Sequence, residues 1–333
     1  MNFLEELNKS YERQAITKEI KENLSAFYQT YSKAIMESGG DVSNYTPLLC
    51  KFISMIEKQL KHPYQFEPYH HRITEPFDYY HYCLDFLRPL IIFEKSSSVG
   101  EEYLNEIDEH LKNGENVIFL ANHQTEPDPQ AISFLLEKSH HHIAEQMIFV
   151  AGHRVTTDPL AVPFSLGRNL LCIYSKKHIE HLPEKKMERM RHNQRTMQVM
   201  EDLLREGSKC IYVAPSGGRD RANESGQIEV AKFDAQSIEM FKLIAERSKT
   251  RTHFYPLSLF TYHLLPPPSG IEKNVGEQRH TKSTPIHMAV GKELDMENFP
   301  HSDGLNKKEK RIARADYIHS IVKENYDKLL QPK

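Results

Sequence analysis

Apolar residues recur at helical spacing through roughly the first 62 residues, where no convincing strand pattern occurs. The clearest stripe is formed by Ile20, Leu24, Phe27, Tyr28, Tyr31 and Ile35. Gly39 and Gly40 end that helix, and residues 1–14 predict a helix before it. Another helix is expected after Thr46, as its N-cap, with Pro47 at the first helical position. We therefore expect a small N-terminal helical bundle, followed by a packed linker over residues 62–76.

Beyond the linker, short β-rich apolar runs alternate with amphipathic helical stretches. The expected strands lie at 116–121, 147–151, 170–174, 209–214, 252–261 and 286–290. The expected helices lie at 101–112, 130–138, 187–205, 234–248 and 307–330. This alternation predicts an α/β fold, a largely parallel central sheet flanked by helices. We expect an N-terminal helical domain over residues 1–75 and an α/β domain over residues 76–333.

Composition narrows the function classes only slightly. The chain has 333 residues, 39% hydrophobic and 27% charged, with 43 basic and 46 acidic side chains. A net charge of −3 provides no global attraction to nucleic acid or anionic lipid. No apolar run approaches the roughly 18 residues of a spanning helix, and no targeting segment is apparent. The four cysteines lie far apart without metal-ligand spacing, so we expect a cytoplasmic protein without a metal site.

Polar residues that directly follow a strand are the first candidates for a site, because ligands bind beyond the carboxyl ends of parallel strands. His123 follows one strand and lies five positions before Asp128, a pairing in which a carboxylate orients a general base. His153 and Asp158 have the same spacing after another strand. The helix expected from residue 130 favours His123, because its free N–H groups can face a developing negative charge. A hydrogen-bonded turn is the alternative interpretation of either histidine.

Two further segments follow strands and carry cations suited to a phosphate. Residues 174–178 read YSKKH and include Lys177, and residues 214–221 read APSGGRDR and include Arg219 and Arg221. A solvated surface turn is the alternative for each segment taken singly. Ser216 is not part of a nucleophile elbow, and no Gly-rich dinucleotide or ATP motif is present. Three polar clusters at three strand ends indicate one shared site.

Taken in order, these segments resemble the soluble glycerol-3-phosphate acyltransferases of plastids and some bacteria. The resemblance is carried by NHQTEPDP at 122–129, FVAG at 149–152, GRNL at 167–170, YSKKH at 174–178 and APSGGRDR at 214–221. Looser likeness occurs at 233–235, 255–257 and 266–269. The resemblance implies a helical N-terminal domain and an α/β domain that carries the site. Pro127 stands where the family is expected to have a smaller residue.

The resemblance also implies acyl transfer from an acyl thioester to the 1-hydroxyl of sn-glycerol 3-phosphate, without a cofactor. By position, it assigns catalysis to His123 and Asp128, and phosphate binding to Lys177, His178, Arg219 and Arg221. We expect direct transfer without an acyl-enzyme, with His123 as the general base and Asp128 holding its ring. The expected donor is acyl-acyl carrier protein or acyl-CoA.

Two alternatives remain. In the first, the enzyme acylates dihydroxyacetone phosphate or 1-acyl-glycerol 3-phosphate, each of which has a phosphate for the same cations. In the second, the protein is not an enzyme and binds acyl carrier protein or phospholipid. A basic run over residues 176–195, including Lys185, Lys186 and Arg189, suggests a docking patch for an acidic acyl carrier protein. An ordinary solvated helix face is the other interpretation of that run. We also expect at most transient contact with a membrane surface, for release of the product.

Overall fold

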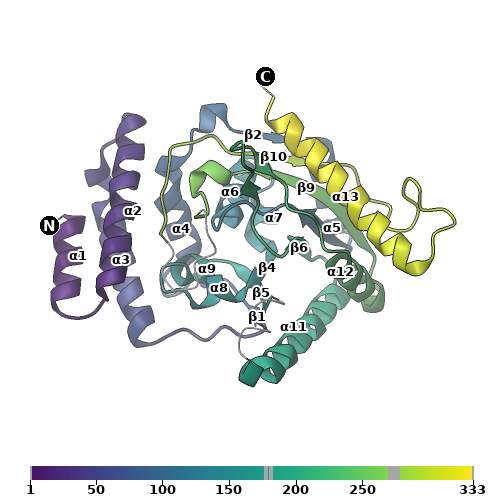
Figure 1. Ribbon diagram of the computed structural model, residues 1–333, viewed down its shortest axis with the longest axis horizontal. Helices are drawn as coiled ribbons and strands as arrows, with labels where there is room; N and C mark the ends of the chain where they lie inside the picture. Colours follow the sequence, from purple (N-terminus) through teal and green to yellow (C-terminus); the bar gives the residue numbers. More distant parts are fainter. Residues whose placement is uncertain (1, 176–178, 180–182, 269–277, 332–333) are drawn as a thin grey trace.

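Three helices form the N-terminal part of the computed structural model, which describes residues 2–175, 179, 183–268 and 278–331. They are α1 (Phe3–Glu12), α2 (Lys18–Glu37) and α3 (Thr46–Lys61), and they lie side by side in Figure 1. Helix α1 begins with a capping box between Asn2 and Glu5. Thr46 is not the N-cap of α3, as we had expected. A 3-10 turn runs directly into the helix, so Thr46 already has helical backbone angles and Tyr45 holds the cap position.

The linker after α3 contains a strand that the sequence pattern did not reveal. Strand β1 (Tyr69–His70) pairs antiparallel with β5 (Asn169–Ile173) at the sheet edge. Helix α4 (Tyr79–Leu87) follows, capped by Asp78, and packs between the N-terminal helices and the sheet domain. Both elements were missed because two paired residues and a single aromatic-rich helix of nine residues produce little periodic signal.

One eight-stranded sheet organises the rest of the chain, in the order β1-β5-β4-β6-β3-β9-β10-β2. Its other strands are β2 (Ser97–Val99), β3 (Asn116–Ala121), β4 (Ile148–Gly152), β6 (Cys210–Val213), β9 (Thr252–Phe260) and β10 (His287–Val290). The five central strands β5, β4, β6, β3 and β9 are parallel neighbours, whereas β10 pairs antiparallel with β9. The predicted, largely parallel sheet is therefore confirmed. Strands β7 (Arg221–Ala222) and β8 (Ile228–Glu229) form a separate hairpin.

Helices cover both faces of this sheet (Figure 1). Successive β3 residues alternate between two apolar clusters, with Ile118 and Leu120 in one and Val117 and Phe119 in the other. The first cluster includes side chains of α11 (Lys186–Glu206), α12 (Ala235–Ser248) and α13 (Lys307–Leu329). The second includes those of α5 (Glu101–Lys112), α6 (Asp128–Leu136) and α7 (His141–Gln146). Burial on both faces explains why the central strands appear in the sequence as continuous apolar runs.

Two short helices lie between β4 and β5, in a segment that is not among the expected helices. They are α8 (His153–Thr157) and α9 (Val162–Leu166). Pro163 occupies the first turn of α9, a position that proline tolerates, and Gly167 ends the helix. The apolar core of the N-terminal helices continues into Phe134 and Leu160 of the sheet domain. The division into domains at residue 75 stays a prediction.

Candidate active site

His123 and Asp128 form a hydrogen-bonded pair at the carboxyl end of β3. His123 Nδ1 lies 2.8 Å from Asp128 Oδ2, and the His123 side chain is 30% exposed whereas that of Asp128 is 1% exposed. Strand β3 ends at Ala121, and α6 begins at Asp128, two residues earlier than expected. The turn between them brings the two side chains together. Because an ionised carboxylate accepts the Nδ1 proton, Nε2 is left to accept a proton from a substrate.

Asp128 accepts hydrogen bonds from several donors besides His123. The backbone N–H groups of Gln124 and Thr125 donate to its two oxygens at 2.8 Å and 3.2 Å. The Thr261 hydroxyl donates to Oδ1 at 2.5 Å, from the end of β9. A carboxylate with this many donors is held in position. The His123 ring is therefore oriented by a side chain that cannot itself turn away.

The first turn of α6 offers less to a developing negative charge than the sequence suggested. The Asp128 N–H group already donates to the Thr125 carbonyl at 3.1 Å. Pro129, the next residue, has no N–H group. Among the first three residues of α6, only Gln130 still has a backbone N–H group that could face a developing negative charge. These helix amides therefore contribute at most one donor to the site.

A buried polar network behind His123 connects the loop at residues 214–221 with the turn that carries His123 and Asp128. The Asp220 N–H donates to the His123 carbonyl at 2.6 Å, while the Asp220 carboxylate accepts from Asn122 at 2.8 Å and from Gln124 at 3.2 Å. Burial raises the pKa of the Asp220 carboxyl, against the lowering effect of its hydrogen-bond donors. Asp220 stands between Arg219 and Arg221 in the sequence. The network therefore fixes the backbone from which these two arginine side chains extend.

The structure separates the two histidine–aspartate spacings. Asp158 accepts from Arg279 Nη2 at 2.9 Å and from the Leu160 N–H at 2.9 Å, and not from His153. The His153 ring lies against Tyr174, with ring centroids 4.6 Å apart. Asp158 is therefore engaged by other groups, whereas Asp128 is hydrogen-bonded to His123.

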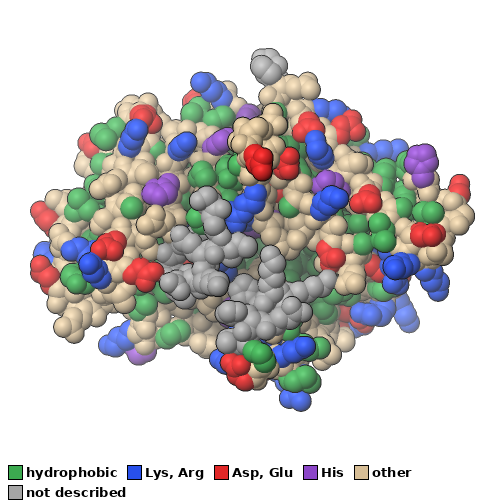
Figure 2. Space-filling view, in the orientation of Figure 1, with side chains coloured by type: hydrophobic (Ala, Val, Ile, Leu, Met, Phe, Trp, Pro, Cys, Tyr) green, Lys and Arg blue, Asp and Glu red, His purple; other side chains and the backbone are tan. Residues whose placement is uncertain are grey.

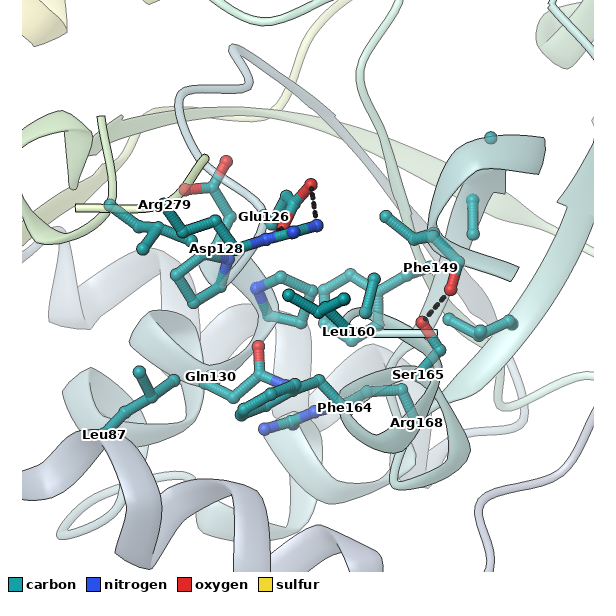
Figure 3. A pocket seen from close by; sticks show the side chains of 18 of the residues that line it. Leu87, Glu126, Asp128, Gln130, Phe149, Leu160, Phe164, Ser165, Arg168 and Arg279 are labelled. Carbon is teal, nitrogen blue, oxygen red and sulfur yellow. Dashed lines mark hydrogen bonds and ion pairs between the residues drawn. The ribbon is translucent and has the colours of Figure 1, made fainter. Parts of the chain in front are cut away.

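Two arginines meet the Glu126 carboxylate beside the His123–Asp128 pair. Arg279 donates to Glu126 through Nε at 2.8 Å and Nη2 at 3.1 Å, and Arg219 Nη1 lies 3.9 Å from Glu126 (Figure 3 shows the Arg279 pair). Burial alone would raise the pKa of Glu126, but Arg279 and Arg219, with Arg154, lower it. Arg221 donates to the Pro268 carbonyl at 3.1 Å. Lys177 and His178, the other two predicted phosphate ligands, lie outside the described residues.

An apolar pocket opens beside His123 and continues between the sheet and the N-terminal helices. His123, Glu126 and Arg279 line it together with Phe149 and Leu160, and α2 and α4 close it from the other side. In Figure 3 the charged Glu126 and Arg279 lie at one end, and Phe164 and Arg168 lie at the other. A ligand with a polar head and an apolar tail matches this arrangement.

The basic run on α11 is less uniform than its sequence suggested. Lys185 and Lys186 are exposed, but Arg189 is 8% exposed and lies over the Tyr174 ring at 5.2 Å. Because it is buried, Arg189 does not belong to an exposed docking patch. The lower rim of Figure 2, over the start of α11, shows basic, acidic and hydrophobic side chains intermixed.

A cluster of histidines and glutamates lies at the opposite end of the central strands. His253 Nε2 and His110 Nδ1 are 2.9 Å and 2.7 Å from the same Glu115 oxygen. The two rings stack with centroids 3.5 Å apart and planes at 17°. Hydrogen bonds of both ring nitrogens to this one carboxylate oxygen account for the close approach of the two rings.

Several site residues escaped the sequence analysis. Asn122 and Gln124 flank His123, and Thr261 follows β9, so the rule that polar residues follow strands applies to all three. Glu126 lies inside the recognised segment, but its partners could not be inferred. Arg279 carries no local signal, because it reaches the site from a loop about 150 residues further along the chain.

Comparisons with known proteins show the family to which the chain belongs. The Acyltransferase family profile matches residues 102–259. The chain is 35% identical to the chloroplastic glycerol-3-phosphate acyltransferase of Arabidopsis thaliana, over 98% of this chain and 72% of that protein. It is 38% identical to a chloroplastic glycerol-3-phosphate acyltransferase of Cucurbita moschata, over 98% of this chain and 74% of that one. Among solved structures, the 1-acyl-sn-glycerophosphate acyltransferase of Thermotoga maritima aligns with a TM-score of 0.41 and 17% identity, covering 76% of this chain and 79% of that one. None of the described helices is long and apolar enough to cross a membrane.

Proposed function

The chain belongs to the glycerol-3-phosphate acyltransferase family, and we propose that it transfers an acyl group from a thioester to the 1-hydroxyl of sn-glycerol 3-phosphate. The product is 1-acyl-sn-glycerol 3-phosphate, and the leaving group is the thiol of the donor. The observation that carries this proposal is the His123–Asp128 pair, with Nδ1 and Oδ2 2.8 Å apart, where a cationic group and an apolar pocket meet.

His123 supplies the base in this reaction. Its Nε2 takes the proton of the 1-hydroxyl as the oxygen attacks the thioester carbonyl, and the imidazolium so formed is stabilised by Asp128. Collapse of the tetrahedral intermediate breaks the carbon–sulfur bond, and His123 returns the proton to the thiolate. The Asp128 carboxylate keeps its position throughout, because it accepts from two backbone N–H groups and from Thr261.

The acyl group passes directly between the substrates. Burial raises the pKa of the Cys83, Cys172 and Cys210 thiols, to about 12 for Cys172, so none of these three is a ready thiolate nucleophile. Ser165, in the pocket wall, donates its hydroxyl proton to the Val155 carbonyl. Because the described residues of the pocket include no activated nucleophile, His123 acts on the acceptor hydroxyl itself.

The two ends of the pocket hold the two substrates. Arg219 and Arg279, which share Glu126, provide the cationic surroundings for the phosphate, and Lys177, His178 and Arg221 complete them in this proposal. The apolar walls receive the acyl chain. Fixing both substrates brings the hydroxyl and the carbonyl to contact distance, the largest entropic contribution available to such a site.

Thiol release from an acyl thioester tests the proposal. The rate should depend on sn-glycerol 3-phosphate and exceed the rates with dihydroxyacetone phosphate, 1-acyl-glycerol 3-phosphate and glycerol. A preference for either of the other two phosphates would identify a different acceptor. Binding of acyl donor without thiol release from any acceptor would show a non-catalytic protein.

We propose acyl-acyl carrier protein as the main donor, with acyl-CoA as the lesser one. The support is the exposed pair Lys185 and Lys186 at the start of α11, since an acidic carrier is steered by exposed cations. Reversing both to Glu should raise KM for the carrier-bound donor several-fold and leave KM for glycerol 3-phosphate unchanged. Lys307 and Lys308, an exposed pair at the start of α13, provide the matched control. Equal effects of the two reversals would remove the docking patch.

We propose that the protein is located in the cytoplasm and contacts a membrane surface only transiently, when the product leaves. Four unpaired cysteines, three of them buried, suit a reducing compartment. Fractionation of cells that express a tagged chain tests this, and a stable membrane fraction would contradict it.

A further inference from the structure

A charged side chain lies at the inner end of the apolar pocket. Arg168 follows α9 and precedes β5, and it is 3% exposed. It lines the same pocket as His123, at the end opposite Glu126 and Arg279 (Figure 3). Gly167 packs so closely on α4 that an added Cβ would lie 2.7 Å from the Tyr79 backbone. The backbone that carries Arg168 is therefore fixed against the helix that closes the pocket.

The guanidinium of Arg168 is only partly satisfied. Nη1 donates to the Ser133 hydroxyl at 2.7 Å, and the group lies over the Tyr80 ring at 4.6 Å. Nε and Nη2 are buried and have no hydrogen-bond partner, and no described carboxylate pairs with this arginine. Two charged N–H donors in an apolar pocket are costly unless something in the pocket accepts from them.

Gln130 adds an acceptor to the same region. It is 2% exposed, it lines the pocket, and its Oε1 has no hydrogen-bond partner. Gln130 stands on α6 two residues after Asp128, so one helix connects the catalytic pair with the pocket interior. In Figure 3 the Gln130 amide lies between the catalytic end and Arg168.

An acyl chain meets two different surfaces as it grows longer. Each methylene placed against Phe149, Leu160 or Phe164 leaves water for an apolar wall and tightens binding about fourfold. A methyl end that reaches Arg168 instead covers unpaired charged donors and excludes any acceptor from them. The gain in binding affinity per added carbon must therefore stop, and then become a loss, where the acyl chain meets Arg168.

We propose that Arg168, with Gln130, forms a polar end to the acyl pocket that limits the length of the acyl chain and accepts an oxygen at the chain terminus better than a methyl group. This rests on the proposed function, in which the pocket holds the acyl chain. Arg168 acts as a specificity-determining residue and takes no part in the transfer itself.

Equilibrium binding of non-hydrolysable thioether analogues of acyl-CoA tests the proposal without needing turnover. Chains of eight to twenty carbons, plain and with a terminal hydroxyl, are titrated into the wild-type protein. Affinity for the plain series should rise by about fourfold per carbon and then fall beyond one length. At that length the hydroxyl-ended chain should bind at least as tightly as the plain one, although the hydroxyl weakens binding of all shorter chains.

Arg168→Met removes the charge at similar side-chain length and should move the optimum to longer plain chains by two carbons or more. Arg168→Lys should keep the wild-type optimum. Arg314→Met is the matched control, since Arg314 is also buried, at 4% exposed, but pairs with Glu239 outside the pocket. KM for glycerol 3-phosphate should stay the same in all three.

Two outcomes would overturn the proposal. One is an identical chain-length profile in folded Arg168→Met and wild type. The other, which needs no variant, is a plain series that keeps gaining affinity at every length while the hydroxyl weakens binding throughout. Both leave the proposed function standing if thiol release depends on glycerol 3-phosphate. Failure of every thioether to bind, together with no thiol release, would overturn both proposals.

Discussion

Replacing His123 with Ala removes the proposed base while disturbing little else. The side chain is 30% exposed, and among the described residues it is hydrogen-bonded to Asp128 alone. Asp128 keeps its three other donors, so the buried carboxylate stays satisfied. We expect unfolding to become easier by only about 1 kcal/mol, the net value of one hydrogen bond.

The chemical loss should be much larger. General-base catalysis contributes about 10²–10⁴-fold, so kcat should fall by at least about 10² while KM for both substrates changes little. That fall corresponds to at least about 2.7 kcal/mol in the activation barrier. The assay is thiol release with saturating acyl donor and glycerol 3-phosphate, beside a thermal unfolding curve for each variant.

His153→Ala is the matched control, because it removes a histidine with the same spacing to an aspartate but no bond to it. It should retain most of the activity. Asp128→Asn should lose activity through misorientation of the His123 ring, and the double variant should be no worse than His123→Ala alone. Near-normal kcat in His123→Ala, an inactive His153→Ala, or fully additive losses in the double variant would each refute the reasoning.

Three further outcomes follow from other contacts. Arg219→Ala should raise KM for glycerol 3-phosphate about tenfold or more, with a smaller change in kcat and no change in the poor rate with glycerol. Equal wild-type rates with glycerol and with glycerol 3-phosphate would show that the proposed phosphate site does not exist. Arg279→Met should destabilise the fold by about 3 kcal/mol at pH 7, because Glu126 loses its bidentate partner. The pKa of Glu126 is lowered in the folded chain, so the stabilising contribution of this carboxylate is present above its unfolded pKa and is lost as the pH falls through its folded pKa. In urea unfolding, the difference in unfolding free energy between wild type and Arg279→Met should therefore shrink below about pH 4. A difference that stays constant with pH would contradict this. Asn306→Ala should cost about 1 kcal/mol, since Asn306 forms a capping box at the start of α13, and a neutral result in the same urea assay would count against it.

The sequence by itself determined the alternation of helices and strands in the sheet domain. Helix α5 and strand β3 have the predicted bounds, and the other central strands shift by one residue or so. This works because a strand buried on both faces and an amphipathic helix each impose their own period on neighbouring residues. The same local logic placed His123 and Asp128 in one turn, since only five positions separate them.

Elements without a sustained period were beyond such reasoning. Strand β1 and helices α8 and α9 span two to five residues, too few to repeat a pattern. The cap of α3 was misplaced because the preceding turn, and not Thr46, decides where the helix begins. These are differences of detail, and they leave the sheet intact.

Only the tertiary structure decided what surrounds the catalytic pair. The choice between His123 and His153 depends on Asp158 pairing with Arg279, a residue 121 positions away. The burial of Arg189 beside Tyr174, and of Arg168 at the inner end of the pocket, likewise depends on packing between distant segments. Hydrophobic periodicity records which side of an element is buried but not which neighbour buries it. That is why the folding of the chain, and not its local pattern, determines the charges at both ends of the pocket.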